Sequence, residues 1–464
     1  MNILFPVETL SREFDYKLIL AHRVIQKFPE AQAFIGSVSA IHNHVKDFKH
    51  GVYFGKTIFP STNQKINISW FNKFKNNGFD FVYLHEEGAV WFGDEDEWSK
   101  NMTFQYDINL FTKDDVLCVW GETQRKLESQ RNRNNVPIVV TGSPRFELGS
   151  QYSFLFNQRV KGLKNKYKDF ILINGNFGLS NHGDGFDKMF SYISQKAKTY
   201  NDNLNYFIDR YISSNNRMLR MCQLVLIAAD KYPDTNFIYR PHPSEHLSSY
   251  YDIFRGKKNI IVERRGAVLE YILASKGMIH DGCTTSLDAV TTNIPILNYK
   301  IVNDDFDIFL PNQIGEMATD VDSAIRYIGL MLNETKTYQT KSYSTKAANL
   351  LYNLNHDDSF DKCEEILNDK IKSKINHNLI DSKAPSISKL RRNSYYRIIK
   401  INLATIKNKL INEQNKLSRD KYLLNKYGSI KKKEFEYKLN LLIKYHKATV
   451  KGKYITNKIF HLGR

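Results

Sequence analysis

The stretch Asn236-Phe237-Ile238-Tyr239-Arg240-Pro241-His242-Pro243 joins an apolar, strand-like run to a turn that its two prolines exclude from a helix. About forty residues later, Met278-Ile279 leads into the polar segment His280-Asp281-Gly282-Cys283-Thr284-Thr285-Ser286. In an open α/β sheet, ligands bind beyond the carboxyl ends of parallel strands, where helix N-termini present their amides. The two segments therefore predict a phosphate-binding sheet edge and a nucleotide-dependent enzyme.

Apolar runs of this kind recur along the chain and alternate with helix-like stretches. They lie at 3–6, 33–36, 52–54, 79–84, 116–120 and 137–141, and then at 169–174, 237–240, 260–262, 278–280 and 295–298. Helical patterns are expected at 12–27 and at 206–231. Such alternation is typical of parallel α/β sheets. We expect an α/β fold with two Rossmann-like domains facing a cleft, at residues 1–165 and 166–370.

The net charge of +18 is concentrated at the end of the chain. Residues 371–464 contain 24 Lys and Arg against 5 Asp and Glu, whereas the rest contains 43 basic and 44 acidic residues. Apolar residues from Tyr396 to Leu417 recur at helical spacing among the basic ones. This pattern predicts a basic helical extension at 371–464 that binds a membrane surface or a partner protein.

Composition also bears on the compartment. No apolar run approaches the eighteen residues of a membrane span, and Met1–Pro6 reads as a first strand, not as a signal peptide. The widely spaced cysteines show no ligand pattern and are expected to be reduced thiols; they are Cys118, Cys222, Cys283 and Cys363. We expect a cytoplasmic protein without metal or cofactor.

His242 is expected at the sheet edge, where an imidazole, together with Arg240, can donate to a phosphate oxygen. The alternative is a structural turn with an incidental histidine. Gly282 permits close backbone approach, and the hydroxyls of Thr284, Thr285 and Ser286 stand at a predicted helix start. Helix capping by Thr284 or Ser286 is the alternative for these hydroxyls. Cys283 is expected to be a packed residue.

Two further turns follow strand-like runs. Asn174-Gly175-Asn176 can approach a nucleotide or sugar, or simply form a turn. His85-Glu86-Glu87-Gly88 offers a general base, for which we prefer Glu87, although a solvated loop acid is the commoner case. The remaining carboxylates considered for such a site are Asp184, Asp187, Asp209, Asp281 and Asp288.

In order, these segments resemble bacterial surface-carbohydrate proteins related to the retaining β-Kdo glycosyltransferases of lipopolysaccharide and capsule assembly. The resembling segments are 85–88, 120–124, 141–146, 174–178, 240–245 and 280–289, within roughly residues 1–320. The sequence departs from the family where Gly175 replaces a frequent threonine and where His85, not aspartate, precedes Glu86.

The resemblance implies a GT-B-type glycosyltransferase whose donor is a CMP-activated ulosonic acid such as Kdo and whose acceptor is a glycan or lipid-linked glycan. It implies that His242 and the Thr284–Ser286 turn hold the donor phosphate, and that Arg240 or Arg265 pairs with the sugar carboxylate. It also implies a nucleophilic aspartate, for which Asp209 is preferred and Asp281 is the rival. The donor site would comprise Asn174, Asn176, Arg240, His242, Arg265, His280, Gly282, Thr284, Thr285 and Ser286.

Other functions stay open at this point. A polyol-phosphate or sialic-acid transferase would share the architecture, as would a nucleotide-sugar epimerase, which needs no acceptor. A nucleic-acid-binding protein is an alternative from another class, since a basic tail attracts phosphate polyanions. No recognisable nucleic-acid module accompanies the tail, so we expect no nucleic-acid partner and favour peripheral attachment to the inner membrane.

Overall fold

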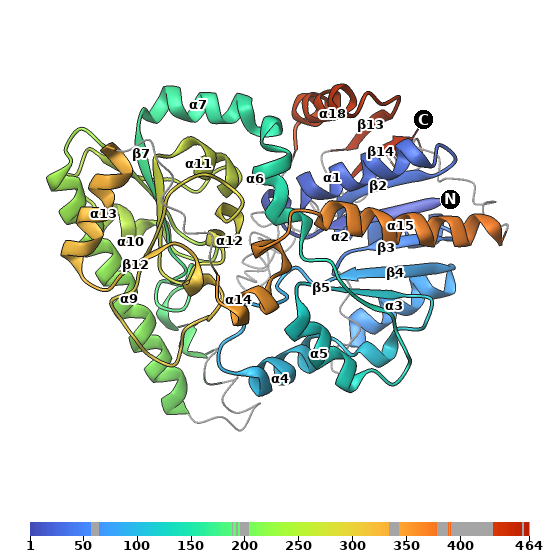
Figure 1. Ribbon diagram of the computed structural model, residues 1–464, viewed down its shortest axis with the longest axis horizontal. Coiled ribbons are helices and arrows are strands. Elements are labelled where there is room, and N and C mark those ends of the chain that lie inside the picture. The colour runs from blue at the N-terminus through green and yellow to red at the C-terminus, as the bar shows by residue number, and fades with distance from the viewer. Residues whose placement is uncertain are drawn as a thin grey trace, which may run out of the picture. The chain divides into compact units, whose positions relative to one another are not determined.

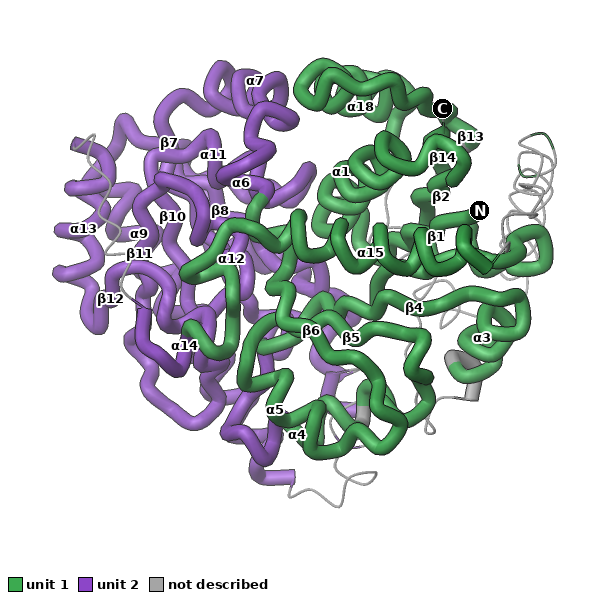
Figure 2. Tube along the Cα trace, turned by 45° about the vertical axis from the view of Figure 1, so that its right-hand side comes forward, with its two compact units in different colours: residues 1–89, 99–147, 348–464 green, residues 90–98, 148–347 purple. Residues whose placement is uncertain are grey.

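The computed structural model describes residues 1–56, 65–187, 189–191, 194, 204–333, 343–377, 388, 390, 430–456 and 459–463. These residues form two compact units, each with helices packed on a mostly parallel sheet (Figures 1 and 2). Unit 1 contains the described residues of 1–89, 99–147 and 348–464, and unit 2 those of 90–98 and 148–347.

The sheet of unit 1 has the strand order β13-β14-β2-β1-β3-β4-β5-β6 in the described chain. Its strands are β1 (Asn2–Val7), β2 (Gln32–Ser37), β3 (Gly51–Phe54), β4 (Phe79–Leu84), β5 (Val116–Val119), β6 (Ile138–Val140), β13 (Lys451–Thr456) and β14 (Ile459–Gly463). Strands β1 to β6 are parallel, and the strand order reverses between β1 and β3. The helices are α1 (Leu10–Lys27), α2 (Val38–Asn43), α3 (Lys65–Asn76), α4 (Glu95–Gln105, whose first turn belongs to unit 2), α5 (Glu122–Arg131), α15 (Ser359–Asn376) and α18 (Lys432–His446).

The sheet of unit 2 has the order β12-β11-β10-β7-β8-β9, all parallel. Its strands are β7 (Phe170–Asn174), β8 (Asn236–Arg240), β9 (Ile260–Val262), β10 (Gly277–His280), β11 (Ile296–Tyr299) and β12 (Glu316–Ala318). The helices are α6 (Leu148–Gln151), α7 (Asn157–Tyr167), α9 (Leu204–Lys231), α10 (Leu247–Ile253), α11 (Val268–Ala274), α12 (Thr285–Ala289), α13 (Val321–Asn333) and α14 (Thr345–Leu350, which crosses into unit 1). Every residue of β7 is buried, as expected for a central parallel strand covered on both faces.

The fold class is therefore the predicted one, α/β with two Rossmann-like domains. All eleven expected strands are present, as are the expected helices α1 and α9. The unit boundaries differ from the expected ones, because α6 and α7 pack in unit 2 and α15 returns to unit 1. Phe360, Cys363, Leu367 and Ile371 of α15 are fully buried there.

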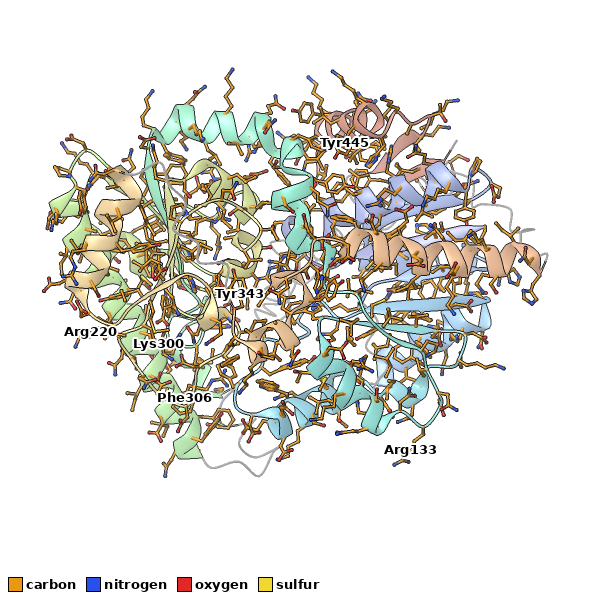
Figure 3. All side chains as sticks on the ribbon, viewed as in Figure 1. Arg133, Arg220, Lys300, Phe306, Tyr343 and Tyr445 are labelled. Atoms are coloured by element: carbon orange, nitrogen blue, oxygen red, sulfur yellow. The ribbon has the colours of Figure 1, made fainter. Side chains whose placement is uncertain are left out.

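The described part of residues 371–464 is not the separate helical extension expected from its charge. Strand β14 pairs antiparallel with β2, and β13 pairs with β14, so the chain end extends the sheet of unit 1. Phe460 is fully buried, and Lys438 of α18 donates to Asp15 at 2.6 Å, whereas Tyr445 on α18 is exposed (Figure 3). The amphipathic pattern from Tyr396 to Leu417 lies outside the described residues. Among the described helices, none is long and apolar enough to cross a membrane.

Candidate functional site

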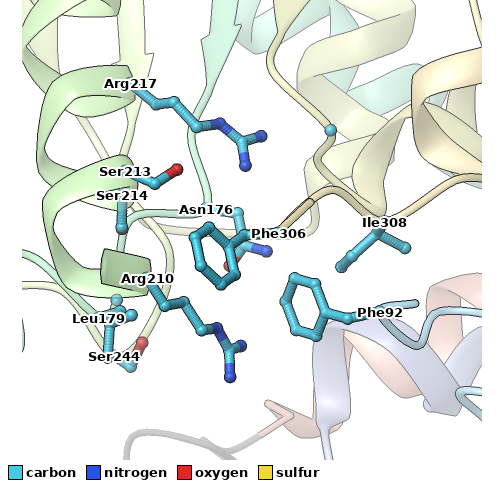
Figure 4. A pocket seen from close by; sticks show the side chains of 12 residues that line it. Phe92, Asn176, Leu179, Arg210, Ser213, Ser214, Arg217, Ser244, Phe306 and Ile308 are labelled. Atoms are coloured by element: carbon cyan, nitrogen blue, oxygen red, sulfur yellow. The ribbon is translucent and has the colours of Figure 1, made fainter. Parts of the chain in front are cut away.

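Unit 2 contains a pocket of about 230 Å³ at the carboxyl ends of β7, β8 and β10. The strand order reverses between β7 and β10, which is where ligands bind in open α/β sheets. The pocket is close to the size range of small-molecule sites, which begins at about 300 Å³. Figure 4 shows the residues that line it: Phe92, Asn176, Gly178, Leu179, Arg210, Ser213, Ser214, Arg217, Ser244, Gly282, Phe306 and Ile308.

One face of α9 supplies four of these residues. Arg210, Ser213, Ser214 and Arg217 are spaced three and four residues apart, so they lie on one side of the helix and point into the pocket (Figure 4). Guanidinium groups are donors suited to phosphate or carboxylate oxygens, whereas Ser213 donates its hydroxyl to Asp304 and Ser214 donates to Ser180. This face therefore gives the pocket the chemistry of an anion site.

Arg217 is held by two carboxylates. It donates to both oxygens of Asp281, at 2.8 and 2.6 Å, and its Nη1 lies 3.4 Å from Asp307. Burial disfavours its charge, but the pair with Asp281 raises the pKa of Arg217 above the usual value. Arg217 is thus a fixed, partly neutralised cation at the back of the site.

Arg210 lies among aromatic side chains. Its guanidinium carbon is 4.0 Å from the centre of the Phe92 ring, within the range of cation–π contact. Phe92 belongs to residues 90–98, a segment of unit 2 that lies in the sequence between two parts of unit 1. It forms an antiparallel β-bridge with Ile308, also of unit 2. Phe306 packs edge-on against Tyr206. An arginine held against one aromatic face can bind an anion beside a planar ring.

The turns after β7, β8 and β10 form the rest of the wall. A Cβ on Gly178 would lie 2.2 Å from Ser244 Oγ, so a larger residue there would have to displace that hydroxyl. Gly282 has a φ of +57°, and a Cβ there would lie 3.0 Å from Arg217. The sequence-predicted turns are therefore brought together, with Asn176 and Gly282 on the pocket wall.

His242 is half-buried beside the pocket-lining Ser244. Its Nδ1 accepts from the Ser244 amide at 3.2 Å and lies 2.7 Å from Ser244 Oγ. Because Nδ1 accepts a backbone N–H, a neutral His242 carries its proton on Nε2. That tautomer makes Nε2 a donor, as a phosphate-binding role requires.

The two arginines expected to bind a sugar carboxylate lie elsewhere. Arg240 is buried over the Tyr271 ring and donates to the carbonyls of Arg265 and Gly266 at 2.9 and 3.1 Å. Arg265 has a side chain that is 90% exposed, 3.6 Å from Glu263. Neither arginine lines the pocket. The sequence-based expectation failed because the position of Arg240 at a strand end does not reveal which backbone carbonyls its guanidinium binds.

Several other predicted donor-site residues are buried in the structure. Asn174 donates to the Met278 sulfur at 3.1 Å, and His280 shares a hydrogen bond with the Ile314 carbonyl at 2.9 Å. Burial lowers the pKa of His280 to about 4, so the ring is neutral at pH 7. Neither residue lines the pocket.

The hydroxyl turn is also set back from the pocket. Thr285 donates to Cys283 at 3.1 Å, and Ser286 is fully buried with no hydrogen-bond partner for its Oγ among the described residues. Thr284 precedes α12 without a side-chain capping bond. Since α12 has only five residues, its N-terminus offers little of the anion attraction expected from the sequence. Cys283 is packed, as expected.

The predicted catalytic carboxylates do not line this pocket. Asp209 is exposed on α9, one position and about 100° of helix away from Arg210. Asp281 is occupied by Arg217. No carboxylate occurs among the described residues on the pocket wall, and no described group of three His, Cys, Asp or Glu side chains could hold a metal ion. The nucleophile and the absence of a metal stay predictions.

Glu87 belongs to unit 1 and lies at the carboxyl end of β4. Its side chain is 48% exposed, 3.7 Å from Lys56 and 3.9 Å from Arg12. Its neighbour Glu86 is buried, accepts from Tyr16 and lies 3.2 Å from Lys17. Of the two, Glu87 is the accessible one, which agrees with the sequence-based preference; its role as a base stays a prediction.

The sequence reasoning missed the α9 face. The signal was available as Arg210-x-x-Ser213-Ser214-x-x-Arg217, a polar stripe at helical spacing on the helix directly before β8. It also missed Phe92, because nothing in the sequence indicates that residues 90–98 pack with the second unit.

No family model and no curated protein matches this chain. Solved structures match it at the level of the backbone. A UDP-GlcNAc 2-epimerase from Methanocaldococcus jannaschii, in complex with UDP-GlcNAc and UDP, is 12% identical, with 79% of this chain and 99% of that chain covered and a TM-score of 0.49.

Two further structures are similar to the same extent. The wall teichoic acid polymerase TagF is 10% identical, with coverage of 81% and 89% and a TM-score of 0.47. A UDP-GlcNAc 2-epimerase from Neisseria meningitidis, bound to UDP-GlcNAc, is 13% identical, with coverage of 79% and 99% and a TM-score of 0.45. At these values we draw no argument about activity from the likeness.

Proposed function

We propose that the protein is a glycosyltransferase that binds a nucleotide-activated sugar in the unit 2 pocket. The observation that carries the proposal is the convergence of Arg210 and the His242 turn at the carboxyl ends of β7, β8 and β10. These groups supply donors for a phosphate, and Phe92 and Phe306 supply apolar faces for a planar base.

The donor we propose is a CMP-activated ulosonic acid such as Kdo, transferred with retention to a glycan of the bacterial surface. Support comes from the sequence resemblance and from the two anionic groups of such a donor, a phosphodiester and a carboxylate. We propose that Arg210 and His242 bind these two anionic groups. They replace Arg240 and Arg265, which the sequence had suggested as partners of the sugar carboxylate and which bind other groups.

The reaction transfers the sugar from phosphate oxygen to acceptor oxygen. In the first displacement a carboxylate oxygen bonds to the anomeric carbon as the bond from that carbon to the phosphate oxygen breaks and its electron pair leaves with CMP. In the second, the acceptor oxygen bonds to that carbon and the carboxylate leaves. The acceptor proton goes to a base, for which we keep Glu87. Donors that hold the leaving phosphate lower the barrier, and retention requires two successive displacements through a carboxylate.

The test is release of CMP. Wild-type protein incubated with CMP-Kdo and a glycan acceptor should release CMP and form a retained linkage, read from the anomeric NMR signals. Arg210→Ala and His242→Ala should abolish turnover, whereas Arg220→Ala, an exposed arginine on the same helix, should not. Glycerol-phosphate transfer from CDP-glycerol, or epimerisation of UDP-GlcNAc without acceptor, would replace the proposal by one of its alternatives.

We also propose that the protein is cytoplasmic and binds the inner membrane through its basic C-terminal region. Residues 378–429 contain 12 Lys and Arg against 3 Asp and Glu. Each basic residue near an anionic surface contributes about 1 kcal/mol. Deleting 371–464 would also remove β13 and β14, so charge substitutions are the cleaner variants.

Arg391, Arg392 and Arg397, changed together to Gln, should release the protein from phosphatidylglycerol vesicles at physiological salt. Phosphatidylcholine vesicles and duplex DNA serve as controls. Unchanged vesicle binding contradicts the membrane role, and tight DNA binding at the same salt favours the nucleic-acid alternative.

A further inference from the structure

The turns after β7 and β8 are joined by one buried carboxylate, that of Glu245. Its Oε1 accepts the backbone N–H of Phe177 at 3.0 Å and that of His242 at 2.8 Å. Its other oxygen accepts from the hydroxyl of Tyr250. Glu245 is 2% exposed, so these bonds are shielded from water.

Both joined turns carry pocket residues. The first contributes Asn176 and Gly178, and the second contributes Ser244. A backbone bond from Gly183 to the Ser244 carbonyl, 2.7 Å long, adds a third point of attachment. The relative placement of these turns, and with it the shape of the pocket wall, depends on the atoms that tie them together.

Glu245 also fixes the backbone of His242. The amide of His242 binds Glu245, and its ring Nδ1 binds the amide and hydroxyl of Ser244, so both ends of the residue are constrained. The tautomer with the proton on Nε2 follows from this second constraint. Movement of the turn would disturb the direction of that donor.

A carboxylate is a costly choice for this position. Burial raises the pKa of Glu245, and the guanidinium of Arg264 donates to the carbonyls of Pro243 and Glu245 at 3.1 and 3.0 Å, not to the carboxylate. A buried acid is retained where its geometry is needed. Here one oxygen accepts two amide N–H groups from two separate turns.

We infer that Glu245 is a positioning residue that sets the geometry of Asn176, which lines the donor pocket, and of His242, which lies next to the pocket-lining Ser244. The inference rests on the proposed function, because it assumes that the pocket binds a nucleotide. It assigns Glu245 no contact with the donor.

The experiment compares three variants of the full chain by calorimetric titration with CMP. Glu245→Ala should weaken CMP binding by about tenfold or more, because loss of hydrogen bonds to a charged group releases both turns. Glu245→Gln keeps one carbonyl oxygen for both amides and should stay within about threefold of wild type. Tyr250→Phe, the matched control, keeps both turn bonds and should stay within about twofold.

The outcomes separate the two claims. Wild-type protein that binds no CMP contradicts the proposed function and removes the basis of the inference. Wild-type binding together with unchanged binding by folded Glu245→Ala contradicts the role of Glu245 alone. If Glu245→Ala does not fold, Glu245→Asp, which is one methylene shorter, must weaken binding, and unchanged affinity there also overturns the inference. NMR of the His242 ring should show altered tautomer populations in Ala and Asp but not in Gln.

Discussion

The two units differ in how their polar side chains are arranged at the point where the strand order of the sheet reverses. Each sheet reverses its strand order once, between β1 and β3 in unit 1 and between β7 and β10 in unit 2. Near the reversal in unit 1, Lys17 is fully buried and lies 2.8 Å from Glu13 and 3.2 Å from Glu86. Near the reversal in unit 2, Arg210, Ser213, Ser214 and Arg217 of α9 line a pocket.

The difference shows that polar residues at strand ends have two distinct fates. In unit 1 the charges of α1 and of the β4 end satisfy one another, with Lys17 also donating to the Pro6 carbonyl at 2.8 Å. In unit 2, Arg217 pairs with Asp281, and Arg210 lies over the Phe92 ring on the pocket wall. We therefore expect substitutions in the first set to change stability and substitutions in the second to change binding.

The largest expected effect is on the stability of unit 1. Lys17→Met leaves Glu13 and Glu86 buried without their central cation, which should cost about 3–5 kcal/mol in the free energy of unfolding. Chemical denaturation followed by circular dichroism measures it. The control is Arg255→Ala, whose exposed pair with Asp252 should contribute no more than about 0.5 kcal/mol. A loss below about 1 kcal/mol for Lys17→Met would show that the network is not structural.

The next effect is on the pH dependence of stability. Burial lowers the pKa of His22 to about 4, and neither ring nitrogen has a hydrogen-bond partner among the described residues. The unfolded chain binds this proton near pH 6.5 and the folded chain only near pH 4, so stability falls as the pH is lowered through that window. Burial acts in the same direction on His42 and His85 of unit 1, lowering each pKa to about 3.

Substitution of His22 tests this pH dependence. The ring of His22 lies 5.2 Å from that of His446, whose pKa is also lowered by burial, and Glu364 and Arg23 flank the latter. His22→Phe should flatten the acid side of the stability profile measured by denaturation between pH 4 and 8. An equally steep profile would assign the acid sensitivity to the other histidines.

The third effect concerns binding. Arg210→Ala should weaken CMP binding by about tenfold, equivalent to about 1.4 kcal/mol, and leave the melting temperature of the free protein within a few degrees. Isothermal titration and thermal melting measure the two quantities. The control Arg220→Ala on the same helix should leave both unchanged. If Arg210→Ala destabilised the fold without altering affinity, the contrast between the units would fail.

The sequence was sufficient to predict the strands of both sheets and the turns that follow β7, β8 and β10. Continuous apolar runs identify parallel strands, and a turn after such a strand must lie at the sheet edge, which placed Asn176, His242 and Gly282 correctly. It was insufficient for α9, because neighbouring helical positions point about 100° apart and only the register separates Asp209 from Arg210. It also missed β13 and β14, whose basic residues read as part of a charged tail.

The smallest expected effect tests a residue that the sequence favoured and the structure places outside the pocket. Arg265 is 90% exposed and lies 3.6 Å from Glu263, a geometry that contributes roughly 0–1 kcal/mol at most. Arg265→Ala should therefore leave unfolding free energy within about 0.5 kcal/mol and CMP affinity within about twofold of wild type. Arg240→Ala should instead lower the free energy of unfolding, because it removes the hydrogen bonds from the Arg240 guanidinium to the carbonyls of Arg265 and Gly266. A large loss of donor turnover in Arg265→Ala, with binding of CMP itself intact, would place the sugar carboxylate on this arginine and move the sugar end of the site away from Arg210.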